Sequence, residues 1–432
     1  MVLVPAWAAL GGDPALPSLV RSTGDTGLGS VLAVGALALG AVGAQRLAAE
    51  ELRTGSAPDG PVVLDARHVG IAFRSERFLR VDGHPAGAGF APLSRFTPAA
   101  DGWVRLHANY PHHLRALHDA LGADPLAVIG TMSATDVEDA VVAAGGVAAA
   151  VRTEQEWAAS DPGAAVRALP VLRLARVGDG RPRAPRLDGL RVLDLTRVIA
   201  GPVGTRTLAS YGADVLRLDS PRLPEDPAAL LDTGPGKRHA RLDLATSDGR
   251  ERFEDLLDGA DVLVQGYRPG ALDRFGLSSA ALAERRPGLV VVTLSAWGTD
   301  GPWAGRRGFD SIVQAATGIA DVTRADDGTP GALPAQALDH AAGHLVAAAV
   351  MRAVTQTGGG GTWHAHLSLA QLATWLLGAP RSTLPPTAPA PDADPYLVDL
   401  DSPTGTVTLV APPGSPVWRH GPVPSGYDES TW

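Results

Sequence analysis

The feature that most constrains the fold is an alternation of strand and helix signals that begins near residue 190. Apolar runs at residues 190–195 (LRVLDL), 214–218, 261–264 and 289–294 predict short buried strands. Helical patterns separate them, one starting at Gly201-Pro202 and another over residues 250–257. Strands and helices that alternate with short connections build right-handed βαβ units. We therefore predict an α/β fold with a doubly wound, mostly parallel sheet.

The chain of 432 residues is long enough for more than one domain. We expect the sheet domain to cover residues 188–380 and a small α+β domain to precede it at residues 85–175. A segment rich in Pro, Gly and Arg at residues 176–187 predicts an exposed linker between them. Residues 1–84 carry an apolar helix and a strand. Residues 381–432 form a Pro-rich tail, which we expect to run back over the small domain.

Composition excludes several classes of function. The net charge is −9 and the basic residues are scattered, so we expect no nucleic-acid partner. The chain has no cysteine, which suits a reducing compartment and rules out thiolate metal sites. The longest apolar run, residues 29–45, is too short and too rich in small side chains to span a bilayer. We therefore expect a cytoplasmic protein without membrane attachment.

The sequence also contains an internal repeat. Asp25 and Asp339 are each followed four residues later by Gly, then by a long apolar helix, a Gly-rich turn and a short strand. Agreement of these features in order favours a partial duplication over coincidence. Residues 1–84 then resemble a partial copy of the region around Asp339.

One turn and one group of histidines are candidates for binding sites. Residues 196–202 follow the first strand of the sheet domain, where open α/β sheets bind ligands. The turn lacks G-x-G-x-x-G, and Pro202 removes an amide, so support for a dinucleotide site is weak. Four histidines gather at positions 107, 112, 113 and 118 without metal-ligand spacing, and we expect packed or solvated imidazoles and no metal.

Four blocks of the second half resemble family III CoA-transferases, the CaiB/BaiF family, in family order. They are residues 190–219 (LRVLDLTRVIAGPVGTRTLASYGADVLRLD), 236–244, 261–276 (DVLVQGYRPGALDRFG) and 295–318 (SAWGTDGPWAGRRGFDSIVQAATG). Residues 90–161 are similar to the family's small domain, which normally follows the helix that carries the nucleophile. In this chain it comes first, so the resemblance implies a rearranged and partly duplicated member.

The resemblance implies a CoA-transferase that works through an aspartate, and Asp339 occupies the family's position for it. The family's usual Gly before this Asp is Leu338 here. A carboxylate at a helix N-terminus is expected to stay ionised beside the positive end of the helix dipole. Asp25 is a rival for the same role. We prefer Asp339 because it follows the complete set of strands.

The resemblance also implies the substrates and the binding residues. Acyl-CoA and a carboxylic acid acceptor would be the partners, coenzyme A would be a substrate and not a tightly bound cofactor, and the protein would be a homodimer. Backbone amides near Val198, Ile199 and Ala200 would line the CoA site. Lys237 and Arg268 would contact its phosphates, although solvated surface charges are an equal alternative for either residue alone.

Two other functions stay open. The same fold carries α-methylacyl-CoA racemases, which need proton-transfer groups on both sides of the α-carbon. Those enzymes have a His where this chain has Phe309, which favours the transferase unless another base is supplied. The altered segment order and Leu338 also leave room for a non-catalytic CoA-binding homologue.

Overall fold

A seven-stranded sheet forms the centre of the molecule in the computed structural model, which describes residues 2–87, 89–382 and 392–432. Its strand order is β11-β10-β9-β12-β13-β14-β8, and all neighbours are parallel except β8, which runs antiparallel to β14. The strands are β8 (Leu172–Gly178), β9 (Arg191–Leu195), β10 (Asp214–Asp219), β11 (Lys237–Arg241), β12 (Val262–Gln265), β13 (Val290–Ser295) and β14 (Thr362–Ser368). The predicted mostly parallel α/β sheet is confirmed.

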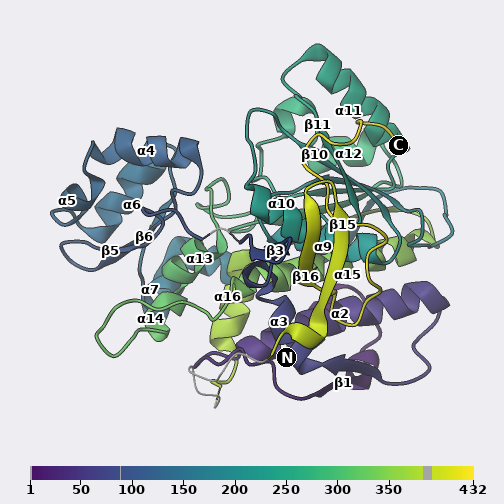
Figure 1. The fold of residues 1–432 in the computed structure, drawn as a ribbon, viewed down its shortest axis with the longest axis horizontal. Coiled ribbons are helices and arrows are strands. Elements are labelled where there is room, and N and C mark those ends of the chain that lie inside the picture. Colours follow the sequence, from purple (N-terminus) through teal and green to yellow (C-terminus); the bar gives the residue numbers. More distant parts are fainter. Residues whose placement is uncertain (1, 88, 383–391) are drawn as a thin grey trace.

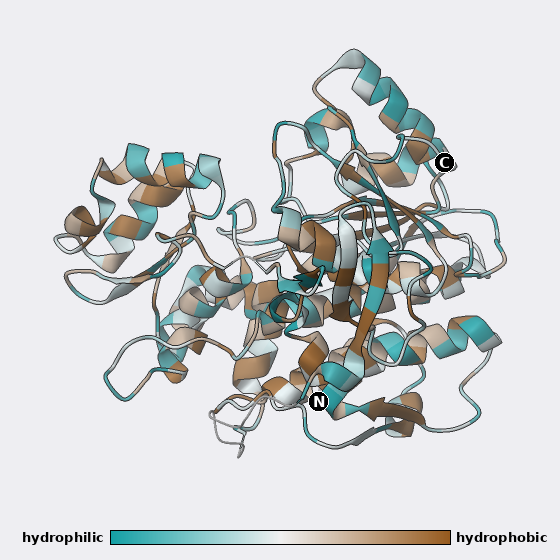
Figure 2. Ribbon diagram, in the orientation of Figure 1, coloured by the Kyte–Doolittle hydropathy of each residue, from teal (hydrophilic) through white to brown (hydrophobic). Residues whose placement is uncertain are grey.

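Helices cover both faces of this sheet because alternate strand residues point to opposite sides. Leu193 and Leu263 pack with α11 (Ser247–Gly259) and α12 (Ser279–Arg285). Val192 and Val262 belong to a second core with α9 (Ala200–Ser210), α15 (Ala337–Thr357) and α2 (Val34–Thr54). Figure 2 shows the apolar residues concentrated around the central sheet, whereas the peripheral α11 is largely hydrophilic.

The small domain stands apart from the sheet and has a core of its own (Figure 1). It contains β5 (Phe96–Pro98), β6 (Trp103–Leu106) and β7 (Ala148–Ala150), with α4 (Pro111–Leu121), α5 (Pro125–Ile129) and α6 (Ala134–Ala143). Two further helices within the predicted range, α7 (Glu154–Ala159) and α8 (Asp161–Arg167), contact α13 (Asp310–Thr317) and α16 (Leu369–Gly378) of the second half.

Two predicted boundaries are wrong. Strand β8 ends at Gly178, so the sheet takes its antiparallel edge strand from residues assigned to the small domain and the linker. Over the described residues 392–432 the tail does not lie over the small domain. Its strands β15 (Leu397–Ser402) and β16 (Gly405–Val410) form a sheet with β3 (Arg80–Val81) and β4 (His84–Pro85), and its indole groups bond to α9 and α11. Part of the predicted tail, residues 383–391, lies outside the described residues.

The N-terminal segment forms a small βαβ unit of its own, in which β1 (Val20–Thr23) and β2 (Val62–Asp65) are parallel and α2 connects them. Helices α2 and α15 both have 21 residues and pack against each other. The helix and the strand expected from the repeat are present as α2 and β2, but Asp25 does not match Asp339 in position, because it is exposed and lies outside the helix, which begins only at Val34.

The remaining short elements connect these layers. They are α1 (Leu3–Ala9), η1 (Leu16–Leu19), α3 (Ala66–Ala72), η2 (Ser75–Arg77), α10 (Pro227–Thr233), η3 (Asp273–Phe275), α14 (Ile319–Val322) and η4 (Asp394–Tyr396). Among the residues that the structure describes, no helix combines the length and apolarity needed to cross a bilayer.

Candidate active site

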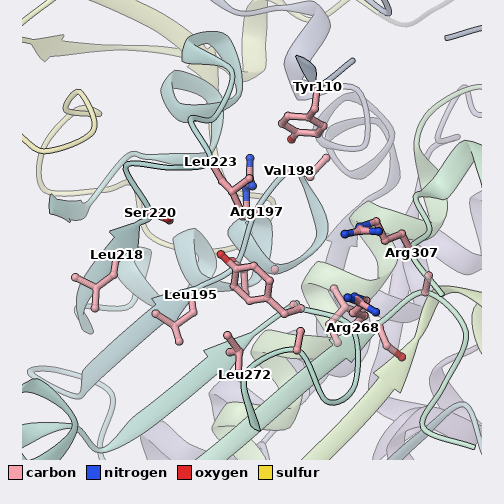
Figure 3. Close-up of a pocket in the computed structure, with 18 of the residues that line it drawn as sticks. Tyr110, Leu195, Arg197, Val198, Leu218, Ser220, Leu223, Arg268, Leu272 and Arg307 are labelled. Carbon is pink, nitrogen blue, oxygen red and sulfur yellow. The ribbon is translucent and has the colours of Figure 1, made fainter. Parts of the chain in front are cut away.

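A cavity of about 760 Å³ opens at the carboxyl ends of the parallel strands. Its walls come from the turns after β9, β10, β12 and β13, from the loop before α13, and from Asp339 on α15. The small domain closes one side with Tyr110, His112 and His113. Figure 3 shows Tyr110, Arg197, Arg268 and Arg307 around this space. Both halves of the chain therefore build one site.

Asp339 is the third residue of α15 and is 6% exposed. No residue in the described ranges donates a hydrogen bond to its carboxylate. Its own amide and that of Leu338 donate to Asp310 Oδ2 at 3.0 and 2.9 Å. Gln314 Nε2 donates to the other oxygen of Asp310 at 2.5 Å. Asp310 thus accepts the hydrogen bonds of these two amides at the start of α15. The Asp339 carboxyl group lines the cavity without a described hydrogen-bond donor.

This arrangement acts against the predicted ionisation of Asp339. Burial raises its pKa well above the ordinary value, and the charges of Asp310 and Glu76 raise it further. Burial likewise raises the pKa of Asp310 to about 6. Desolvation and the neighbouring carboxyl groups therefore oppose the ionisation of Asp339 that the helix N-terminus is predicted to favour.

The predicted turn after β9 is strained where it meets the cavity. Val198 has φ +68°, a left-handed conformation that is costly for a β-branched residue. Its amide donates to Glu225 Oε2 at 3.1 Å, which holds the turn in place. Val198 and Ala200 line the cavity, whereas Ile199 is not among its lining residues.

Lys237 does not contact the cavity. It is fully buried, and its ammonium group donates to Asp194 Oδ2 at 3.1 Å, Thr205 Oγ1 at 2.6 Å and the Pro202 carbonyl at 3.0 Å. Burial opposes ionisation of Asp194, but the charges of Lys237 and Arg217 prevail and lower its pKa to about 2. The predicted phosphate role of Lys237 is wrong in this fold, because strand β11 directs its side chain into the core.

Arg268 does line the cavity, and it is one of six arginines that do so. Arg197, Arg222 and Arg306 form ion pairs with carboxylates. No carboxylate pairs with Arg268, Arg274 or Arg307 within the described part of the chain. An excess of positive charge therefore faces the cavity and suits an anionic ligand.

Residue Phe309 is surrounded by histidines of the small domain. The ring of His107 stacks on it at 3.7 Å between centroids, and the ring of His113 lies 5.6 Å away. Burial lowers the pKa of both histidines to about 3, so their imidazoles are neutral at pH 7. The described residues contain no group of three or more His, Asp or Glu side chains arranged to hold a metal ion.

The rival nucleophile lies elsewhere. Asp25 is exposed, accepts a hydrogen bond from the Gly27 amide at 3.0 Å and does not line the cavity. Sequence reasoning missed Asp310, although it lies inside a block used for the resemblance. It also missed Tyr110 and Arg307, whose place beside the cavity depends on how the small domain packs.

Comparison with known proteins shows what the second half of the chain is similar to. Residues 187–390 match the model of CoA-transferase family III. A probable fatty acyl-CoA transferase from Mycobacterium tuberculosis is 34% identical over 184 residues, which are 40% of this chain and 47% of that protein. A formyl-CoA:oxalate CoA-transferase from Streptomyces coelicolor is 33% identical over 184 residues, covering 40% and 45% of the two chains.

A crystal structure of a CaiB/BaiF family protein from Brucella suis aligns with a TM-score of 0.38 at 27% identity, over 54% of this chain and 66% of that one. This chain spans about half the length of the two curated relatives described above.

Proposed function

We propose that this protein, whose residues 187–390 match the model of CoA-transferase family III, transfers coenzyme A from an acyl-CoA thioester to an acceptor carboxylate through Asp339. The observation that carries the proposal is the unpartnered carboxyl group of Asp339 in the wall of the cavity. A nucleophile needs this freedom, since a carboxylate held by amides or cations is less reactive.

The reaction uses the Asp339 carboxylate twice. Its oxygen attacks the thioester carbonyl, the carbon–sulfur bond breaks, and a mixed anhydride and CoA thiolate result. The thiolate then attacks the Asp339 carbonyl, which releases the donor acid and leaves an aspartyl-CoA thioester. The acceptor carboxylate repeats these steps in reverse. The raised pKa of Asp339 makes its ionised form the more nucleophilic, although less of it is present at neutral pH.

The cavity supplies places for the rest of acyl-CoA. The turn at Val198 and Ala200 lies at the carboxyl end of β9, where open sheets bind ligands. Arg268 is available for a phosphate because no described carboxylate neutralises it. We extend the proposal to a cytoplasmic homodimer that uses coenzyme A as a substrate. Sedimentation analysis of the purified chain tests the dimer directly.

The test is capture of the covalent intermediate. The protein is incubated with acyl-CoA, treated with hydroxylamine or borohydride, and measured by intact mass. We expect the mass change of a trapped aspartyl thioester in the parent chain and in Asp25→Asn, and not in Asp339→Asn, which should also lose CoA exchange between acids. Undiminished exchange by Asp339→Asn would refute the proposal. Absence of both adduct and exchange in the parent would indicate a non-catalytic CoA-binding protein.

A second function, isomerisation at the α-carbon, is favoured by the imidazoles beside Phe309. The small domain supplies His113 to the cavity wall, and this neutral imidazole is a base of the kind that the sequence around Phe309 lacks. Incubation in deuterated water decides between the two reactions. Deuterium entering the α-carbon in the parent, and not in His113→Asn, would support isomerisation.

A further inference from the structure

A serine in the wall of the same cavity contacts a histidine on the neighbouring strand. Ser295 is the last residue of β13, is 7% exposed and lines the cavity. His366 lies on β14, and its Nε2 atom is 3.1 Å from Ser295 Oγ. The parallel register pairs Thr293 with His366 and Ser295 with Ser368, so these side chains share one face of the sheet.

The hydroxyl group of Ser295 has two polar partners, the Gly298 amide and His366. The Gly298 amide donates to Ser295 Oγ at 3.0 Å, which orients the hydroxyl group. In the tautomer of His366 that carries its proton on Nδ1, the Ser295 hydroxyl group donates to His366 Nε2. Burial lowers the pKa of His366 to about 4, against the opposing charge of Asp300, so the imidazole is neutral at pH 7 and can accept the proton. CoA transfer through Asp339 uses neither residue.

We propose that Ser295 and His366 form a second reactive centre in this cavity, which hydrolyses acyl-CoA thioesters. The inference rests on the proposed function only for the identity of the thioester ligand. Sequence motifs give no sign of it, because Ser295 is not in a G-x-S-x-G turn and His366 is 71 residues away.

The chemistry proceeds in two balanced steps. His366 takes the hydroxyl proton while Ser295 Oγ attacks the thioester carbonyl, the carbon–sulfur bond breaks, and CoA leaves as a thiol with the proton from His366. Water then attacks the acyl-serine ester with His366 as base, which releases the carboxylic acid and restores the hydroxyl. A buried imidazole is a weak base, so we expect hydrolysis to be slower than transfer.

The experiment uses the full chain with Asp339→Asn, which removes transfer, and follows release of CoA thiol from acetyl-CoA without an acceptor acid. We expect hydrolysis to persist, and to fall at least about a hundredfold when Ser295→Ala or His366→Asn is added. His364→Asn is the matched control. His364 is two residues away on the same strand face, and no described residue bonds to its ring.

Peptide mapping after a brief incubation gives a second measurement that does not depend on how well the variants fold. An acetyl group on the peptide that contains Ser295 supports the proposal. If hydrolysis disappears with Asp339→Asn and survives Ser295→Ala, it proceeds through the aspartyl anhydride, and the inference is overturned. If the parent hydrolyses through Ser295 but never exchanges CoA, the proposed transferase function fails and the serine centre stands.

Discussion

At the scale of single residues, desolvation controls the charges that matter in this protein. Asp339 is buried beside Asp310 and Glu76, and its pKa is raised. Lys237 is equally buried, yet it is paired with Asp194. The cost of burying a charge is therefore offset for Lys237, which has the counter-charge of Asp194 and is structural. It is not offset for Asp339, which has no counter-charge among the described residues and stays reactive.

The raised pKa of Asp339 makes stability depend on pH. When the pH rises above the ordinary pKa of Asp, residue 339 loses its carboxyl proton in the unfolded chain but keeps it in the folded chain. The free energy of unfolding therefore falls with rising pH until the pH passes the pKa of the folded state. We expect Asp339→Asn to increase the free energy of unfolding by at least about 1 kcal/mol at pH 8. The gain should vanish near pH 4. Urea titrations at both pH values measure it, with exposed Asp25→Asn as control. An identical gain at both pH values would contradict the assignment.

Replacing Lys237 tests its structural role. Lys237→Met leaves the Asp194 carboxylate buried without its ammonium partner, and we expect a loss of about 3–5 kcal/mol in unfolding free energy. The double variant with Asp194→Asn should recover part of this loss. The KM for acyl-CoA of the folded single variant should stay unchanged. A raised KM for acyl-CoA in Lys237→Met, with an unchanged urea midpoint, would instead support contact of Lys237 with the phosphates of CoA.

At the scale of elements, close approach of two helices explains the Gly four residues after Asp339. A Cβ atom on Gly343 would lie 2.6 Å from the Ala200 carbonyl oxygen, and one on Gly204 would lie 2.8 Å from that of Gly343. Helices α9 and α15 can therefore contact each other through backbone. This contact places Asp339 beside the turn at Val198 that leads into α9.

Gly343→Ala should disturb both stability and catalysis. The added methyl group must push α15 from α9, which we expect to cost about 1–3 kcal/mol in unfolding free energy and to lower kcat by moving Asp339. Thermal unfolding and CoA exchange measure the two effects. Gly378→Ala is the matched control, since a Cβ atom there meets nothing within 4 Å. Equal behaviour of the two variants would show that the close approach is unimportant.

At the scale of the whole molecule, the small domain binds the loop before α13, which leads to the active site. Glu138, only 2% exposed, accepts hydrogen bonds from Arg152 at 2.7 Å and from Arg306 at 2.9 Å. Trp303 packs against both guanidinium groups, whose carbon atoms lie 5.2 and 4.1 Å from its ring centroid. This cluster holds a segment of the second half that ends at the Asp310 cap of α15.

Loosening this cluster should weaken substrate binding. Glu138→Gln removes the charge that joins Arg152 and Arg306, and we expect the KM for acyl-CoA to rise several-fold with faster hydrogen exchange in residues 303–309. Asp139→Asn changes the adjacent residue, whose 81% exposed side chain makes only a 3.9 Å ion pair with Arg306, and should have a much smaller effect. Exchange rates that do not differ between the two variants would show that the domains are held together by other contacts.

Local sequence determined the regular parts of this protein. Apolar runs such as residues 190–195 became strands, and the long apolar segments became α2 and α15, because hydrophobic periodicity is set by neighbours along the chain. The same local reasoning overlooked β11, whose residues KRHAR include few apolar side chains. It also placed β8 in the wrong domain, since pairing with β14 is a contact across almost two hundred residues.

The resemblance in residues 190–318 and the position of Asp339 could be found by sequence alone, since both are properties of order along the chain. Only the tertiary structure decided the raised pKa of Asp339, the burial of Lys237, the histidines around Phe309 and the contact of Ser295 with His366. Those properties arise from desolvation and from contacts between distant segments, which exist only once the helices, the sheet and the small domain have packed together.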